Sequence, residues 1–378
     1  MINFFRKMFS KEEKKPEIND TCFSDVPVGN NLLGRVINSN GKACDDLGEI
    51  IPQTYYPAFV DSPDLLKQLP INKKLCTGIR VIDSMLPIGF GQSIGLFAGS
   101  GVGKTTLLSM ISNNNNTDIN VFGIIGERTR EVHDFLNNNL KKDILKHSVV
   151  VIATSDEPAA NRLRVAYVCT AIAEFFRDKG KEVMLMIDSL SRVASAQREI
   201  DISNGKMPVE SGYTSGVFEM IPKLLARSGK TAKGSITAIY SNLFEVDDLN
   251  NPIVDKVFGM MDSRIILSRS LANNNHYPAI DLLKSYSKTS KLLNGEQTQK
   301  ACSQIIKWIA LYDKYERIID FGNYIDDKAT ELKTVIQKHK LIEEFLIQDE
   351  SEYCDFEETI RRLSELSGIE IPPEEYKE

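Results

Sequence analysis

The chain has 378 residues, which allows two or three domains at roughly 150 residues per domain. Hydrophobic residues make up 42% of it and charged residues 26%, as in an ordinary globular protein. The formal net charge of −6 argues against a protein that coats nucleic acid, because such proteins carry a basic footprint. The cysteines and histidines are dispersed without zinc-site spacing, and no apolar run reaches the roughly 18 residues of a membrane span, so we expect a cytoplasmic protein.

The first part of the chain, up to about residue 70, is rich in Gly, Asn, Asp and Pro, which predicts short strands and loops. Apolar runs that alternate with helical patterns follow. The predicted strands are 93–99, 119–126, 148–154, 182–188, 234–241 and 262–268. Near-continuous apolar strands alternating with helices are typical of a mostly parallel sheet covered on both faces, so we expect an α/β core.

From residue 294 onward the pattern is helical to the end of the chain. Apolar side chains keep helical spacing over 305–315 and again over 341–346. We therefore expect three parts, which are an irregular N-terminal segment (1–70), the α/β core (71–293) and an all-α C-terminal domain (294–378).

A glycine-rich run between the first core strand and the following helix is typical of a P-loop. Glycines allow the backbone N–H groups to surround phosphates at the positive end of a helix dipole. Lys104 would reach the β- and γ-phosphates, and the Thr105 hydroxyl would bind magnesium. A plain glycine-rich turn is the alternative, and the strand–helix context favours the P-loop. The predicted nucleotide-binding residues are Gly99, Ser100, Gly101, Val102, Gly103, Lys104, Thr105 and Thr106.

Two carboxylates stand where core strands end. Asp188 closes the strand 182–188, the place of a Walker-B carboxylate that holds magnesium through water, although a helix N-cap is the alternative. Glu127 directly follows the strand 119–126 and could orient and polarise the attacking water. Its neighbour Arg128 could anchor this carboxylate or a phosphate. Taken alone, a Glu-Arg pair is more often a solvated helix start.

Several stretches together resemble the type III secretion and flagellar export ATPases, which are relatives of the catalytic β-subunit of rotary ATP synthases. The stretches are AGSGVGKTTLL, GIIGERTREV, the run from ATSDEP to SAQREI, GSITAIYS and HYPAIDLL. The resemblance implies a RecA-like core, a C-terminal helical domain and a homohexamer with ATP between subunits. It implies that Lys104 and Thr105 bind phosphate and magnesium and that Asp188 belongs to the magnesium shell. It also implies that Glu127 acts on the attacking water. Arg128 and Arg192 resemble the family's supporting site arginines.

The resemblance implies that the protein is an enzyme, an ATPase with ATP and Mg²⁺ as cofactors. ATP hydrolysis would power substrate unfolding, chaperone release and protein export at the cytoplasmic face of an injectisome or flagellar apparatus, peripheral to the inner membrane. The implied partners are identical subunits, a central stalk protein, a stator-like regulator and chaperone–substrate complexes, without nucleic acid.

Two departures from the family keep alternatives open. The family's N-terminal β-barrel is represented only by a short remnant within residues 1–70, so we expect weak hexamer formation. The arginine that reaches a neighbouring ATP site in the family is Lys288 here, and lysine lacks the planar fork that grips two phosphate oxygens. One alternative is a degenerate nucleotide-binding structural subunit with little turnover. Another is a Rho-type RNA translocase, which the acidic composition opposes.

Overall fold

The structure is a computed structural model that describes residues 25–63, 65–243, 252–320 and 329–376. Residues 1–24 of the expected irregular N-terminal segment lie outside these ranges. Its centre is a nine-stranded sheet, most of which is parallel. The parallel strands, from one side of the sheet to the other, are β14 (Ser263–Ile266), β6 (Ser93–Ala98), β13 (Ser235–Leu243), β9 (Glu182–Asp188), β7 (Ile119–Ile125), β8 (Ser148–Ala153) and β2 (Arg35–Asn38).

All six strands predicted from apolar runs are present in this sheet. Every residue of β7 is buried, as are all but one residue of β8. Such runs are apolar without alternation because parallel strands are covered by helices on both faces. The expected α/β core is therefore confirmed.

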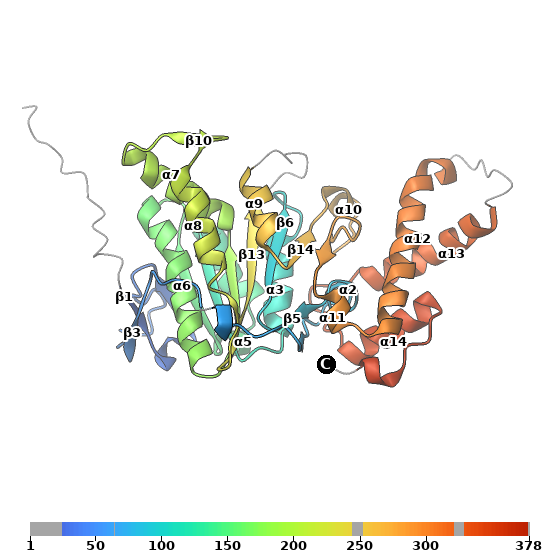
Figure 1. Ribbon diagram of the computed structural model, residues 1–378, viewed down its shortest axis with the longest axis horizontal. Helices are drawn as coiled ribbons and strands as arrows, with labels where there is room; N and C mark the ends of the chain where they lie inside the picture. Colours follow the sequence, from blue (N-terminus) through green and yellow to red (C-terminus); the bar gives the residue numbers. More distant parts are fainter. Residues whose placement is uncertain (1–24, 64, 244–251, 321–328, 377–378) are drawn as a thin grey trace, which may run out of the picture.

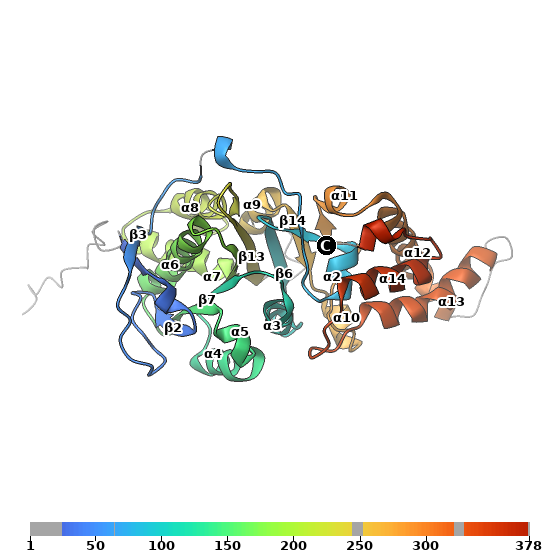
Figure 2. The same cartoon turned by 90° about the horizontal axis from the view of Figure 1, so that it is seen from below.

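Helices cover the two faces of the sheet as the strand composition requires (Figure 2). One face carries α6 (Ala159–Asp178), α7 (Leu190–Ser203), α8 (Ser215–Leu225) and α9 (Pro252–Met260). The other face carries α3 (Lys104–Asn114), α4 (Thr129–Asp134) and α5 (Lys142–Leu145). Two clusters of buried apolar side chains, one on each side of the sheet, form the core.

The segment before the core contributes a strand to the main sheet. Strand β2 pairs in parallel with β8 and forms an edge of the sheet. Strands β1 (Asp25–Val28) and β3 (Thr54–Pro57) pair with each other in antiparallel fashion and lie beside α6 (Figure 1). Residues 35–38 therefore belong to the same sheet as the predicted core, although they precede residue 71.

The helix after β7 is short and is followed by a π-helical turn. Helix α4 ends at Asp134, and Phe135–Asn139 form a π-helical turn closed by the Leu140 N–H, which donates to the Phe135 carbonyl at 3.0 Å. The asparagines of this turn are poor helix formers. Phe135 is buried edge-to-face against Phe122, with 5.5 Å between ring centroids, so packing holds the turn in place.

Short elements connect these layers. They are β4 (Lys74–Leu75), α2 (Arg80–Met85), β5 (Ile88–Gly89), β10 (Pro208–Glu210), β11 (Tyr213–Thr214), β12 (Gly229–Lys230), α10 (Arg269–Asn273), β15 (Tyr286–Ser287) and α11 (Ser290–Leu293). Strand β15 is antiparallel to β14 and forms the other edge of the main sheet.

The C-terminal region is helical, as expected, and stands beside the core next to α2 (Figure 1). It consists of α12 (Glu296–Asp320), α13 (Ala329–Leu346) and α14 (Phe356–Ser367). Asp355 caps α14 by accepting a hydrogen bond from the Glu357 N–H at 3.0 Å. Within the described residues, no helix combines the length and the apolar character that a membrane crossing needs.

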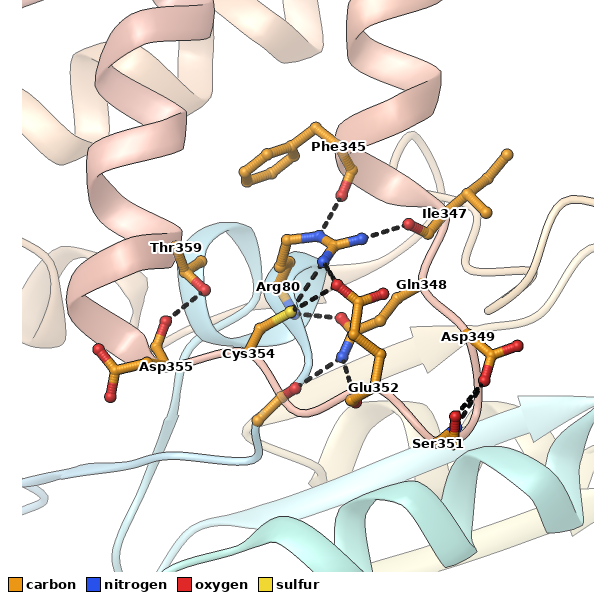
Figure 3. Close-up of polar contacts among 11 residues, drawn as sticks. Arg80, Phe345, Ile347, Gln348, Asp349, Ser351, Glu352, Cys354, Asp355 and Thr359 are labelled. Carbon is orange, nitrogen blue, oxygen red and sulfur yellow. Dashed lines mark hydrogen bonds and ion pairs between the residues drawn. The ribbon is translucent and has the colours of Figure 1, made fainter.

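One buried arginine joins the helical region to the core (Figure 3). The guanidinium of Arg80, at the start of α2, donates to the Phe345 carbonyl at 2.9 Å and also contacts the Ile347 carbonyl and the Glu352 carboxylate. The Gln348 side chain accepts from the Arg80 N–H at 2.9 Å. Arg80 is only 3% exposed, so these partners replace the water that its charge would otherwise bind.

Candidate active site

The glycine-rich loop lies at the carboxyl end of β6 and leads directly into α3. Gly101 (φ 76°) and Gly103 (φ 90°) have left-handed backbone conformations, which favour glycine over residues with a side chain. Ala98, which replaces the usual first glycine of the motif, is the last residue of β6 and keeps an ordinary strand conformation. Helix α3 begins at Lys104, so its free N–H groups face the loop.

Three predicted site residues converge from three elements. Lys104 from α3 forms an ion pair with Asp188, the last residue of β9, and its Nζ lies 3.8 Å from Glu127 Oε1. Strand β7, which precedes Glu127, pairs directly with β9, so the two carboxylates lie at the same edge of the sheet. Lys104 is 8% exposed, and the carboxylates compensate its buried charge.

Arg192 of α7 approaches Glu127 from the other side. Its guanidinium lies 2.9 Å from Glu127 Oε2 and also donates to the Gly126 carbonyl. One carboxylate is thus held between a lysine and an arginine that come from opposite faces of the sheet.

Glu131, in the first turn of α4, faces Glu127 closely enough for their carboxyl groups to share a hydrogen bond. Burial raises the pKa of the Glu127 carboxyl to about 7, and this hydrogen bond acts in the same direction, against Lys104 and Arg192. The same hydrogen bond lowers the pKa of Glu131. A carboxyl that titrates near neutrality is suited to exchange protons with water.

The carboxylates border a cavity of about 240 Å³. Thr105, Glu127 and Asp188 are among the residues that line it, and it continues between α3 and β7. Hydroxyl and carboxylate oxygens are the ligands that Mg²⁺ prefers, so Thr105 and Asp188 fit the predicted magnesium site.

The remaining predicted residues are distributed around this centre. Val102 is buried under the loop, whereas Ser100 and Thr105 are exposed at its surface, and Thr106 is half-buried in the first turn of α3. Arg128 is exposed at the start of α4, and its backbone N–H donates to Glu131. Its side chain forms no ion pair with any described residue.

Lys288 lies apart from the P-loop of its own chain. It follows β15, is exposed, and its N–H donates to the Asp262 carbonyl at 3.0 Å, next to the start of β6. The P-loop follows the other end of β6, roughly 17 Å further along the strand. Lys288 can therefore take the role of the family's arginine only at the ATP site of a second chain.

Three side chains near the loop were not predicted. Ser241, at the carboxyl end of β13, donates to Asp188 Oδ1 at 2.6 Å. Arg269 of α10 donates to the Ser100 carbonyl at 3.2 Å. The Tyr277 ring would contact a Cβ placed on Gly103 at 3.4 Å, so an aromatic surface borders the loop. Ser241 could have been found by the rule that indicated Asp188, because it also ends a predicted strand.

Comparison with known proteins agrees with this geometry. Residues 78–287 match the nucleotide-binding domain of the ATP synthase alpha/beta family, and residues 295–365 match the C-terminal domain of the type III secretion ATPase EscN. Fold and site thus define a P-loop ATPase.

Individual relatives narrow this class. The flagellum-specific ATP synthase of Treponema pallidum is 46% identical over 92% of this chain and 78% of its own length. The SPI-2 type 3 secretion system ATPase of Salmonella typhimurium is 42% identical over 90% and 78%. The assembled ATPase EscN of enteropathogenic E. coli has a TM-score of 0.87 and 40% identity over 91% of this chain and 83% of its own. EscN with its central stalk EscO gives a TM-score of 0.86, with 39% identity and the same coverage. The chain belongs to the type III secretion and flagellar ATPases of the ATP synthase alpha/beta family.

Proposed function

We propose that this protein hydrolyses ATP to power substrate unfolding, chaperone release and protein export at the cytoplasmic face of a type III apparatus, peripheral to the inner membrane. The observation that carries the ATPase proposal is the convergence of Lys104, Glu127 and Asp188 at the end of the P-loop strand. Family membership supports the export role.

The loop and the start of α3 would bind the phosphates through backbone N–H groups, as helix N-termini bind anions. Lys104 would then exchange its carboxylate partners for the β- and γ-phosphates. Magnesium, when bound with ATP, would neutralise phosphate charge, and Thr105 and Asp188 are the residues that would hold it. The Tyr277 ring offers a stacking surface beside the loop for a nucleotide base.

Glu127 is proposed to orient the attacking water and to accept its proton. Arg192 fixes this carboxylate at 2.9 Å, so the group is held in place before substrate binds. Such positioning is the main contribution a protein makes to phosphoryl transfer, because the reaction needs little covalent chemistry from it.

Assembly and partners extend the same proposal. The relative EscN has been solved as an assembled ATPase and with a central stalk. We propose that this chain also forms a ring with a stalk, and that Lys288 of one subunit reaches the phosphates bound by its neighbour. A stator-like regulator and chaperone–substrate complexes are the further proposed partners.

Phosphate release from ATP by the purified full chain tests the proposal, with Lys104→Ala as the blank. We expect Mg²⁺-dependent turnover in the wild type, and loss of both turnover and tight nucleotide binding in the variant. A wild type that binds ATP but releases no phosphate would instead identify a degenerate nucleotide-binding subunit.

A further inference from the structure

We propose that Ser241 is a positioning residue that orients Asp188 toward the magnesium shell. The inference deepens the assignment of the ATP site and rests on the proposed ATPase function. It starts from the place of Ser241 in the sheet.

Ser241 occupies the strand between the two strands that carry the site. Strand β13 pairs on one side with β6, which leads into the P-loop, and on the other with β9, which ends at Asp188. The register places Tyr240 opposite Ile187, so Ser241 is level with Asp188. Ser241 is fully buried, and its hydroxyl needs a partner within the protein.

That partner is one oxygen of the Asp188 carboxylate. The Ser241 hydroxyl donates to Asp188 Oδ1 at 2.6 Å, and Lys104 forms its ion pair with the same oxygen. No described residue donates to Asp188 Oδ2. Two donors on one oxygen fix the plane of the carboxylate and leave the other oxygen free for the metal shell.

Nucleotide binding would make the serine more important. Once Lys104 turns to the phosphates, Ser241 is the remaining side-chain donor to Asp188 Oδ1 among the described residues. Loss of its hydroxyl should therefore act on magnesium-dependent nucleotide binding, with little effect on binding without magnesium.

The same strand offers a matched control. Ser235, the first residue of β13, is also fully buried, and its hydroxyl donates to the Glu182 carboxylate at the start of β9. The two serines thus make the same kind of bond, between the same two strands, at opposite ends. Only the Ser241 end adjoins the P-loop.

The experiment measures the dissociation constant of a fluorescent ATP analogue in EDTA and in Mg²⁺ for the wild type, Ser241→Ala and Ser235→Ala. The readout is the gain in affinity that magnesium produces. We expect Ser241→Ala to lose roughly 10-fold of this gain, the size typical of a residue that orients a metal ligand. Ser235→Ala should keep the gain, and both variants should have similar urea midpoints.

Two results would overturn the inference while leaving the ATPase proposal intact. One is a wild-type magnesium gain in Ser241→Ala. The other is an equal loss of affinity with and without magnesium, which would indicate general support of the loop. A wild-type protein without Mg²⁺-dependent binding or phosphate release would refute the ATPase proposal, and the inference would fall with it.

Discussion

The guanidinium of Arg192 lies 2.9 Å from the Glu127 carboxylate, although the two residues belong to helix α7 and to the turn after strand β7. Arg192 lies on a helix that covers one face of the sheet, and Glu127 lies at the end of the sheet where the parallel strands terminate. The ion pair determines where Glu127 points before any nucleotide is present.

Glu127→Gln should retain ATP binding and lose about 100-fold or more of turnover, the scale of a positioned acid–base group. The amide can still accept a hydrogen bond from Arg192, so geometry is kept while proton acceptance is lost. Nucleotide titration and steady-state phosphate release measure the two effects separately. Near-normal turnover would show that Glu127 is only a charged residue at a helix start.

The pH dependence of kcat/KM should follow the titration of Glu127. Its pKa is raised to about 7 by burial and by the hydrogen bond with Glu131, so the carboxyl is largely protonated below that pH and cannot accept a proton. We therefore expect kcat/KM to rise as pH increases through 7, and Glu131→Gln to move the rise to lower pH. Asp134→Asn, on the same helix, removes a charge without touching this hydrogen bond and should leave the midpoint in place. Coincident profiles for all three proteins would exclude the proton-sharing pair.

Stability should depend strongly on a buried ion pair far from the site. Arg227 and Glu174 are nearly inaccessible and bonded in bidentate fashion, at 3.0 and 2.6 Å. Arg227→Met leaves a buried carboxylate without its partner and should cost about 3–5 kcal/mol of unfolding free energy, measured by urea denaturation. The double variant Arg227→Met/Glu174→Met should recover part of this loss. Arg361→Ala, which removes two exposed ion pairs, with Glu358 and Glu365, should barely change the midpoint.

Lys288→Arg should raise ATPase activity once subunits assemble. An arginine supplied by a neighbouring subunit stabilises the charge of the phosphoryl-transfer transition state, and lysine keeps the charge without the bidentate geometry. We expect a gain of about 10-fold, or ~1.4 kcal/mol of barrier. Lys291→Arg, three residues away and also exposed, serves as the control. Turnover per subunit is compared over a range of protein concentrations. If it reaches the same maximum in both variants, Lys288 does not contact the ATP site of the neighbouring subunit.

The parts of the fold that could be predicted are those with a local signal. Strands such as β7 and β9 are mostly apolar, without a polar alternation, because both faces of the sheet are covered. The site residues Glu127 and Asp188 stand where these strands end. The P-loop is recognisable because its glycines, lysine and threonine are contiguous in the sequence.

The features that could not be predicted depend on pairs distant in sequence. Strand β2 is four residues long, and only its pairing with β8, more than 100 residues later, makes it part of the sheet. The Ser241–Asp188 bond depends on the order of strands in the sheet, which the sequence pattern leaves open. The contact between Arg80 and Gln348 joins polar residues 268 positions apart, and polar pairs of this kind have no periodicity.

The contacts of Arg80 bear on any attempt to divide the chain. The two family matches end and begin at residues 287 and 295, which invites expression of the core alone. Such a truncation would leave the Arg80 guanidinium without the carbonyls of Phe345 and Ile347 and would uncover the apolar side chains beneath α14. Buried charge and apolar packing thus join the helical region to the core, so we expect the core expressed alone to be destabilised.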